Sequence, residues 1–219
     1  TPFLLEQLTE YERPAVFDAC LGSGATTIGL KLAGVKHIMS NEIDEGLFTA
    51  AKREARKRGV EIYVRKLDWR DLGKGLRKQF DVVTCLGNSL TYLFNSRDQL
   101  KSLRSFRAAL KENGKLIIDE RNYAGHFLGG DYRFSGEVVY TGNEAVSAHP
   151  IHISDSMVVM EYQHRETGTK AHLVLYPFKE NELQRLLERA KFTDITVFGD
   201  YQRDFNPSQP EFLTYVCRK

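Results

Sequence analysis

The sequence predicts an α/β fold in which a mostly parallel sheet carries helices on both faces. Short apolar runs alternate with stretches that repeat apolar residues every three to four positions, an alternation typical of β-α-β units. The length agrees with this class, because 219 residues suffice for one full-sized domain and fall short of two ordinary ones. Apolar residues make up 42% and charged residues 27%, the balance of a globular protein that folds in water.

Five strands are predicted in the first 120 residues, each from a short apolar run. They are expected at 15–20, 36–41, 61–67, 80–86 and 115–120. Helices are expected between them: from the glycine turn at 22–24 to about Leu32, through Ala50 and Ala55, and over 96–111. The last of these has apolar residues at helical spacing and ends before Asn113-Gly114.

The pattern changes from about residue 132 to residue 178, where no helical period is found. Three β-runs are expected there, with a hairpin turn at 166–168, and they cover 137–140, 151–164 and 170–176. We interpret 132–178 as an antiparallel β insertion over one edge or end of the sheet. An amphipathic helix at 179–191 and two closing strands follow, at 195–198 and 212–216. No repeat or linker divides the chain, so a single domain over 1–219 is expected.

Charge and cysteine content exclude several classes of protein. Basic residues number 31 and acidic residues 29, which gives a net charge of +2. This charge is too small to indicate binding to nucleic acid or to an anionic membrane. No apolar run approaches the roughly 18 residues of a membrane span. Cys20, Cys85 and Cys217 lie far apart, which argues against a disulfide framework and predicts the cytoplasm. His149 and His152 have no suitable third ligand, so no metal site is expected.

A nucleoside site is predicted where the first two strands end. Asp18 closes the first strand, and Gly22-Ser23-Gly24 lets the backbone approach a ligand before a helix begins. Glu42 ends the second strand, where an acid can accept both hydroxyls of a ribose. A dinucleotide-binding site has Gly or Ala at the third position of the glycine motif, where the helix packs closely on the strand. This sequence has Thr27 there, which counts against a dinucleotide.

S-adenosylmethionine is the alternative, because it carries a ribose and a charged amino acid but no pyrophosphate. Asp18 would then organise the glycine loop and help to hold the ammonium group of the methionine part. Asp68 can accept a hydrogen bond from the adenine amine, and Trp69 can offer its backbone N–H or its ring. Trp69 is alternatively a packing residue of the core.

These residues resemble the successive motifs of class I S-adenosylmethionine-dependent methyltransferases. The resemblance covers roughly the first 120 residues, with Asp-x-x-x-Gly-x-Gly at 18–24, an acid at Glu42, Asp68-Trp69 and Phe80-Asp81-Val82-Val83. It implies a Rossmann-like seven-stranded methyltransferase sheet, mostly parallel with the last strand antiparallel. It also implies S-adenosylmethionine as the cofactor and S-adenosylhomocysteine as its product.

A narrower resemblance, to the glycine/sarcosine N-methyltransferase family, rests on four short segments in the right order. They are Cys85-Leu86-Gly87-Asn88-Ser89-Leu90, Ile118-Asp119-Glu120-Arg121-Asn122-Tyr123, Tyr176-Pro177 and Gly199-Asp200-Tyr201. The resemblance implies N-methylation of glycine and sarcosine on the route to betaine. Open alternatives are an enzyme for sarcosine and dimethylglycine, one for another small amine, a nucleic-acid or protein methyltransferase, and a non-catalytic cofactor-binding protein.

The resemblance implies roles for individual residues. Asn88 lies where family members bind the substrate, and Arg121 lies where they hold the glycine carboxylate. Tyr140, Tyr162 and Tyr176 fall near positions that line the pocket. Cofactor contacts are implied for Cys20 and Leu86 through backbone atoms, for Gly22 and Gly24, and for Tyr92, where the family often has His.

The positions of two residues support these roles independently. Asn88 and Arg121 follow the fourth and fifth strands, and the carboxyl ends of parallel strands share one rim with the glycine loop. The planar fork of an arginine matches a carboxylate, which is the anchor that a small amino acid requires. Arg121 alternatively forms a surface ion pair with Asp119 or Glu120.

The family also closes its site with an N-terminal segment and often forms dimers or tetramers. This chain begins Thr1-Pro2-Phe3, with neither Met nor a signal peptide. We therefore expect residues upstream of Thr1 in the whole protein, and we place part of the active-site lid there. A form that begins at Thr1 is expected to bind cofactor weakly and to lose most activity.

Overall fold

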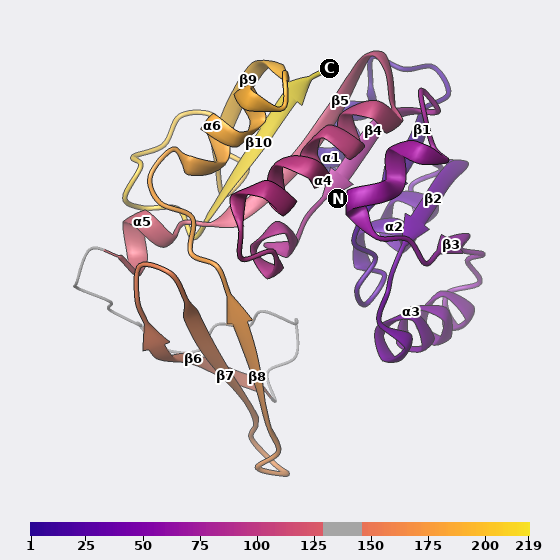
Figure 1. Cartoon of the computed structure of the whole chain (residues 1–219). Helices are drawn as coiled ribbons and strands as arrows, with labels where there is room; N and C mark the ends of the chain where they lie inside the picture. The colour runs from indigo at the N-terminus through magenta and orange to yellow at the C-terminus, as the bar shows by residue number, and fades with distance from the viewer. Residues whose placement is uncertain (129–145) are drawn as a thin grey trace.

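A seven-stranded sheet with helices on both faces forms the body of the protein, and a smaller three-stranded sheet projects from it (Figure 1). The computed structural model describes residues 1–128 and 146–219. The order of the large sheet is β3-β2-β1-β4-β5-β10-β9, and β10 is the one strand of this sheet that runs opposite to the others. Its strands are β1 (Ala15–Asp18), β2 (His37–Asn41), β3 (Val64–Arg65), β4 (Phe80–Cys85), β5 (Leu110–Arg121), β9 (Thr193–Gly199) and β10 (Phe212–Arg218). The predicted mostly parallel sheet is confirmed.

Consecutive residues of the central strands point to opposite faces, where different helices cover them. Phe17 and Val83 pack against the face covered by the 3-10 helix η1 (Trp69–Lys74), α4 (Ser96–Ala109) and α6 (Glu182–Arg189). Val16 and Val82 pack against the other face, under α1 (Pro2–Leu8) and α2 (Ala25–Leu32). The sheet is therefore buried on both faces, which explains why its strands read as unbroken apolar runs.

Local side chains fix where the helices begin. Asp44 accepts a hydrogen bond from the Leu47 backbone N–H at 2.7 Å and starts α3 (Glu45–Lys57). Gly24 is the N-cap residue of α2, and its φ of 88° lies in the left-handed region. A Cβ at Gly24 would also stand 3.2 Å from the Cβ of Ala51, so α2 and α3 could not pack as closely with any other residue.

Several short helices and one strand differ from the sequence predictions. The helices α1, η1, η2 (Ser89–Tyr92) and α5 (Tyr123–His126) were not predicted, and the third strand is shorter than the expected 61–67. The sequence did contain a signal for α1, because Leu4 and Leu8 have helical spacing. Both side chains are buried in the structure. Elements of four to seven residues carry too few periodic positions to stand out from loops.

The smaller sheet contains β6 (Val146–Ile153), β7 (Val158–His164) and β8 (Lys170–Leu175), all antiparallel. The predicted turn at 166–168 is confirmed, with Gly168 at φ 68°. The prediction of one strand over 151–164 is wrong, because the chain reverses where the Ser154 N–H donates to the Met157 carbonyl at 2.9 Å. The polar pair Asp155-Ser156 was the missed turn signal. The strand expected at 137–140 lies outside the described residues.

Residues 1–128 and 146–219 contain no helix that is long and apolar enough to cross a membrane. Over the same ranges, no three His, Cys, Asp or Glu side chains gather in a way that could hold a metal ion.

Glu120 is a buried carboxyl group on the α6 face of β5. Its side chain is 4% exposed, and its Oε1 accepts a hydrogen bond from the Tyr215 hydroxyl at 2.7 Å. Its Oε2 is buried without a hydrogen-bond partner among the described residues. Burial penalises the charged form and raises the pKa of Glu120 from 4.5 to about 8.

We expect this group to lower the stability of the protein as the pH rises from about 4.5 to about 8. The unfolded chain releases the Glu120 proton near pH 4.5 and the folded chain near pH 8, so the folded state holds the extra proton throughout this window. Each rise in pH within it then favours unfolding, by roughly 3–5 kcal/mol over the whole window. Glu120→Gln should remove the contribution of Glu120 and so make the loss of stability between about pH 4.5 and pH 8 smaller than in wild type.

Urea unfolding at several pH values checks the expectation. Glu166→Gln is the matched control, because Glu166 is exposed on the hairpin and its loss should leave the slope unchanged. Parallel losses of stability in wild type and Glu120→Gln would show that Glu120 titrates normally in the fold.

Candidate active site

A cavity of about 690 Å³ opens at the carboxyl ends of β1, β2 and β4. Its walls are the glycine loop after β1, the residues that follow β2, the segment that leads into η1 and the turn after β4. Among the residues predicted to contact a cofactor, Asp18 and Gly24 do not line this cavity. The others do: Cys20, Gly22, Glu42, Asp68, Trp69, Leu86 and Tyr92.

Asp18 lies behind the cavity wall, where it is 1% exposed. Its Oδ2 accepts a hydrogen bond from the Thr27 hydroxyl at 2.6 Å, and its Oδ1 accepts from the Cys20 backbone N–H at 3.3 Å. Burial raises the pKa of Asp18 above its usual value. This geometry supports the expected role of Asp18 in organising the glycine loop, and its contact with an ammonium group stays a prediction.

Thr27 occupies the third position of the glycine motif for a structural reason. Its single hydroxyl proton goes to Asp18, so Ser40 must be the donor in the 2.8 Å contact between the Thr27 and Ser40 hydroxyls. A glycine or alanine at this position would remove the strongest donor from a buried carboxylate. Thr27, which does not fit the motif of a dinucleotide site, therefore stabilises the glycine loop through Asp18.

Glu42 fixes the glycine loop from the neighbouring strand. Its Oε2 accepts from the Gly22 N–H at 2.9 Å, and its Oε1 accepts from the N–H groups of Ile43 and Asp44 at 2.8 and 2.9 Å. A carboxylate has about four acceptor positions, so one at Oε2 is left for a ligand hydroxyl. Gly22 has a φ of 54° and nothing within 4 Å of where a Cβ would stand, so the space above it is open.

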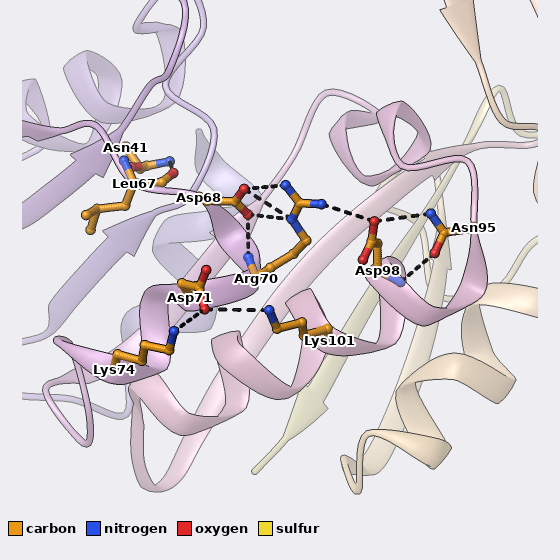
Figure 2. A network of polar contacts seen from close by, with 9 residues as sticks. All are labelled: Asn41, Leu67, Asp68, Arg70, Asp71, Lys74, Asn95, Asp98 and Lys101. Carbon is orange, nitrogen blue, oxygen red and sulfur yellow. Dashed lines mark hydrogen bonds and ion pairs between the residues drawn. The ribbon is translucent and has the colours of Figure 1, made fainter.

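The Asn41 side chain holds the segment that leads into η1. Its Oδ1 accepts from the Leu67 N–H at 2.8 Å, and its Nδ2 donates to the Leu67 carbonyl at 3.1 Å, as a paired strand would (Figure 2). Trp69 then reaches across the cavity, and its indole N–H donates to the Ala19 carbonyl at 2.7 Å. The ring of Trp69 also meets Phe106 edge-on at 6.1 Å, so the residue both lines the cavity and packs against the core.

Asp68 is held by an arginine that sequence reasoning missed. Figure 2 shows Arg70 between Asp68 and Asp98: its Nη2 donates to the Asp68 Oδ2 at 2.6 Å, and its Nη1 donates to the Asp98 Oδ2 at 3.1 Å. Arg70 lowers the pKa of Asp68 to about 2, so this carboxylate is an ionised acceptor at the cavity wall. Asn95 holds Asp98 in turn, at 3.1 Å.

The turn after β4 is tied to the end of β5 through buried polar groups. Asp119 accepts from the N–H groups of Asn88 and Gly87, at 2.6 and 3.0 Å, and burial raises its pKa to about 6. Asn88 is 4% exposed and has a φ of 62°. Its Oδ1 accepts from the Arg121 N–H at 2.9 Å, and its Nδ2 donates to the Tyr123 hydroxyl at 2.7 Å. The structure thus brings Asn88 and Arg121 together.

The guanidinium of Arg121 lies among aromatic rings. It is 5.0 Å from the ring centre of Phe212 and 5.8 Å from that of Phe127. Arg121 is only 6% exposed, so it does not lie on the surface, where the alternative of a surface ion pair placed it. Since Arg121 and Asp119 are two residues apart on one strand, they share a face. Arg121 therefore lies next to the Gly87-Asn88 turn, and Gly87 is part of the cavity wall.

Comparison with known proteins places the chain in a family. Residues 16–114 match the family model described as a methyltransferase domain. The chain is 35% identical over 218 residues to a glycine/sarcosine N-methyltransferase of Parasynechococcus marenigrum. The aligned region covers 99% of this chain and 76% of that protein. A protein of the same name from Halorhodospira halochloris is 31% identical over 217 residues, covering 99% and 80%. The chain belongs to the glycine/sarcosine N-methyltransferase family.

Solved structures show the same fold. An S-adenosylmethionine-dependent methyltransferase from Clostridium acetobutylicum superposes with a TM-score of 0.78, over 99% of this chain and 89% of that one, at 20% identity. The predicted Rossmann-like methyltransferase sheet and the class I superfamily are therefore confirmed for this member of the glycine/sarcosine N-methyltransferase family.

The tyrosines that the family resemblance singled out lie in different places. Tyr162 is on β7, where burial raises its pKa while the nearby positive charge of Arg121 lowers it. Tyr176 directs its hydroxyl to the Glu182 carboxylate at 2.8 Å and packs its ring against Phe178. Tyr162 therefore lies near Arg121, whereas the Tyr176 hydroxyl is bound to Glu182. Tyr140 lies outside the described residues.

The backbone of Leu86 is already hydrogen bonded within the protein. Its N–H donates to the Cys20 sulfur at 3.0 Å, and its carbonyl accepts from the Cys20 thiol at 3.1 Å and from the Ser89 hydroxyl at 2.8 Å. Both lone pairs of that carbonyl are engaged, so the geometry favours a contact of Leu86 with a cofactor through its side chain. The expected backbone contacts of Leu86 and Cys20 stay predictions.

Replacing Arg70 with alanine should weaken cofactor binding about three- to tenfold. The side chains of Arg70 and Asp68 are 40% and 45% exposed, so loss of the solvent-screened pair should change the stability little. Asp68, however, loses the group that holds its carboxylate at the cavity wall. Calorimetric titration with S-adenosylmethionine measures the effect, with Lys74→Ala as the control, because Lys74 makes a similar exposed pair with Asp71. Equal affinities for the two variants would remove the assigned role of Arg70.

Proposed function

We propose that this chain transfers the methyl group of S-adenosylmethionine to the amine of glycine and of sarcosine, with S-adenosylhomocysteine as the second product. The observation that carries the proposal is Arg121, a buried cation between two rings, beside the turn that lines the 690 Å³ cavity. Family membership supports it, because the relatives at 31–35% identity are named glycine/sarcosine N-methyltransferases. A carboxylate anchor at the rim of a cofactor cavity is what a small amino acid requires.

The residues around the cavity fit the cofactor. Glu42 would accept the ribose hydroxyls with the acceptor position left at its Oε2, and Asp68 would accept from the adenine amine with a carboxylate that Arg70 keeps ionised. The open space above Gly22 would admit the ligand close to the backbone. Bound S-adenosylmethionine would supply an electrophilic methyl group on a sulfonium centre.

The substrate side needs positioning more than acid–base chemistry. The guanidinium of Arg121 would hold the substrate carboxylate through two parallel hydrogen bonds, in a setting where aromatic rings exclude water. Asn88 would keep the Arg121 backbone and the Tyr123 hydroxyl in place. These residues would hold the neutral amine nitrogen in line for transfer of the methyl group, and the proton of the amine would pass to water or a nearby carbonyl.

The proposal includes the organisation and setting of the enzyme. We propose a single domain over 1–219, with 132–178 as an inserted antiparallel subdomain, and a homo-oligomer in solution. The three cysteines are free thiols, which supports the cytoplasm as its compartment. The substrate is a small amino acid rather than a nucleic acid, and the product enters a route to betaine.

A panel of amines tests the substrate. We expect methylated product from glycine and from sarcosine and little from dimethylglycine, measured as initial rates by mass spectrometry with S-adenosylmethionine present. A higher kcat/KM for dimethylglycine than for glycine would favour the alternative enzyme that completes betaine. Methylation of none of the three, despite binding of S-adenosylmethionine, would contradict the proposal.

A further inference from the structure

Two consecutive residues of the turn after β4 adopt a backbone conformation that needs support. Gly87 has a φ of 75° and Asn88 a φ of 62°, both in the left-handed region. Residues other than glycine rarely adopt this conformation, and it persists where surrounding groups hold it. The turn joins the two parts of the site, because Gly87 lies in the wall of the 690 Å³ cavity and Asn88 contacts the end of β5.

The carboxylate of Asp119 supplies this support. Its Oδ1 accepts a hydrogen bond from the Asn88 N–H at 2.6 Å, and its Oδ2 accepts from the Gly87 N–H at 3.0 Å. Asp119 is 5% exposed, so water competes little for these N–H groups. An ionised carboxylate accepts strongly at both oxygens, whereas a protonated carboxyl or an amide keeps one strong acceptor oxygen. The ionised form is therefore the one that holds both residues of the turn.

Asn88 connects the turn to Arg121. Its Oδ1 accepts from the Arg121 N–H at 2.9 Å, and its Nδ2 donates to the Tyr123 hydroxyl at 2.7 Å, so both ends of the amide are tied to the segment that ends β5. A shift of the turn would move this amide and leave the buried Arg121 N–H without its partner, which is costly. Arg121 is the residue proposed above to hold the substrate carboxylate.

We propose that Asp119 is a positioning residue for methyl transfer: its ionised carboxylate holds the Gly87-Asn88 turn, and the turn fixes the end of β5 from which Arg121 reaches the substrate. This inference rests on the proposed function. Asp119 is not part of the cavity wall, so it acts through the turn rather than on a ligand.

Asp119 is the group beside the turn whose charge changes near pH 6, because burial raises its pKa to about 6. Titratable groups of the described residues lie near it on β4, after β9 and on its own strand: Cys85, Tyr201, Glu120 and Arg121. Near pH 6 the first three are neutral, since the pKa values of Cys85 and Tyr201 are raised above their usual values and that of Glu120 is about 8. Arg121 stays positive, and Thr214, which lies opposite Asp119 on β10, carries no charge.

Kinetics of the full-length protein test the proposal, with Asp119→Asn compared with wild type at about pH 5 and about pH 7.5. The measured quantity is the ratio of the two kcat/KM values for glycine, in which the ionisation of the glycine amine cancels. At the higher pH we expect wild type to exceed the variant about 10- to 100-fold, mainly through a lower KM, because the variant loses one charge-assisted hydrogen bond. At the lower pH Asp119 is mostly protonated in wild type, so the ratio should fall about tenfold. A ratio that does not change with pH would overturn the proposal.

Thr214→Val is the matched control. Thr214 shares a face of the sheet with Asp119, is 1% exposed, and its hydroxyl has no hydrogen-bond partner among the described residues. Its substitution should leave the kcat/KM for glycine within about twofold of wild type at both pH values. A loss as large as that of Asp119→Asn would trace both effects to disturbed packing and contradict the assigned role.

Nuclear magnetic resonance spectra of the wild-type, full-length protein keep the test independent of how the variants fold. The amide signals of Gly87 and Asn88 should move together with a midpoint near pH 6, because both N–H groups donate to Asp119. The amide signal of Leu67, which donates to the uncharged side chain of Asn41, should stay in place. Signals of Gly87 and Asn88 that do not move would overturn the proposal. Moving signals in an enzyme that methylates no glycine would contradict the proposed function instead.

Discussion

Replacing Arg121 with alanine is expected to raise the KM for glycine about 100-fold or more while the affinity for S-adenosylmethionine stays within a few fold. The guanidinium is buried among rings, where a charged hydrogen bond to a carboxylate is stronger than in water. Arg121 lies beside the cofactor cavity rather than in its wall, so its loss should weaken the binding of the amino acid and leave the binding of the cofactor nearly unchanged. Initial rates over a range of glycine concentrations measure the KM, and calorimetry measures the cofactor affinity.

Two further variants separate substrate binding from folding. Arg121→Lys keeps the charge and the packing of the stem but lacks the planar fork, so it should recover part of the affinity for glycine. Arg104→Ala removes an exposed arginine on α4 and should leave the KM unchanged. Near-normal glycine kinetics in a folded Arg121→Ala enzyme would show that another group holds the carboxylate.

Replacing Glu42 with alanine should weaken S-adenosylmethionine binding about 100-fold. This carboxylate provides the proposed acceptor for the ribose and also holds the N–H groups of Gly22, Ile43 and Asp44, at 2.8 to 2.9 Å. The variant therefore loses both a direct contact and the fixed shape of the glycine loop, and each loss amounts to a charge-assisted hydrogen bond or more.

The control for this variant is Glu45→Ala, three residues further along the chain. Glu45 is exposed and pairs with Lys66 outside the cavity wall, so its loss should change the affinity less than twofold. Calorimetric titration gives both affinities. If Glu42→Ala and Glu45→Ala bind the cofactor equally well, the ribose is recognised elsewhere.

The arrangement of the strands was readable from the sequence because the sheet is buried on both faces. Apolar runs such as 80–86 mark strands directly, and a parallel sheet brings the residues after each strand to one rim. That rule alone predicted the meeting of Gly22, Glu42 and Asp68 at one cavity. It also predicted that Asn88 and Arg121 would lie close together.

The supporting residues were not readable, because their roles depend on which backbone groups need a partner after folding. Asp119 accepts from two N–H groups of a turn 31 and 32 residues away in sequence, a relation that no local pattern contains. Arg70 follows Asp68 by two residues, but its second partner, Asp98, comes from another helix. The strand expected over 151–164 failed for the opposite reason, since the short turn at Asp155-Ser156 interrupts an otherwise continuous β pattern.

The most direct test of the proposed function is transfer of a labelled methyl group. The full-length protein is incubated with glycine and S-adenosylmethionine that carries carbon-13 in its methyl group, and the products are measured by mass spectrometry. The proposal predicts labelled sarcosine, and then labelled dimethylglycine, with one S-adenosylhomocysteine formed for each methyl group transferred. Consumption of the cofactor without labelled sarcosine, or binding of the cofactor with no turnover, would contradict it.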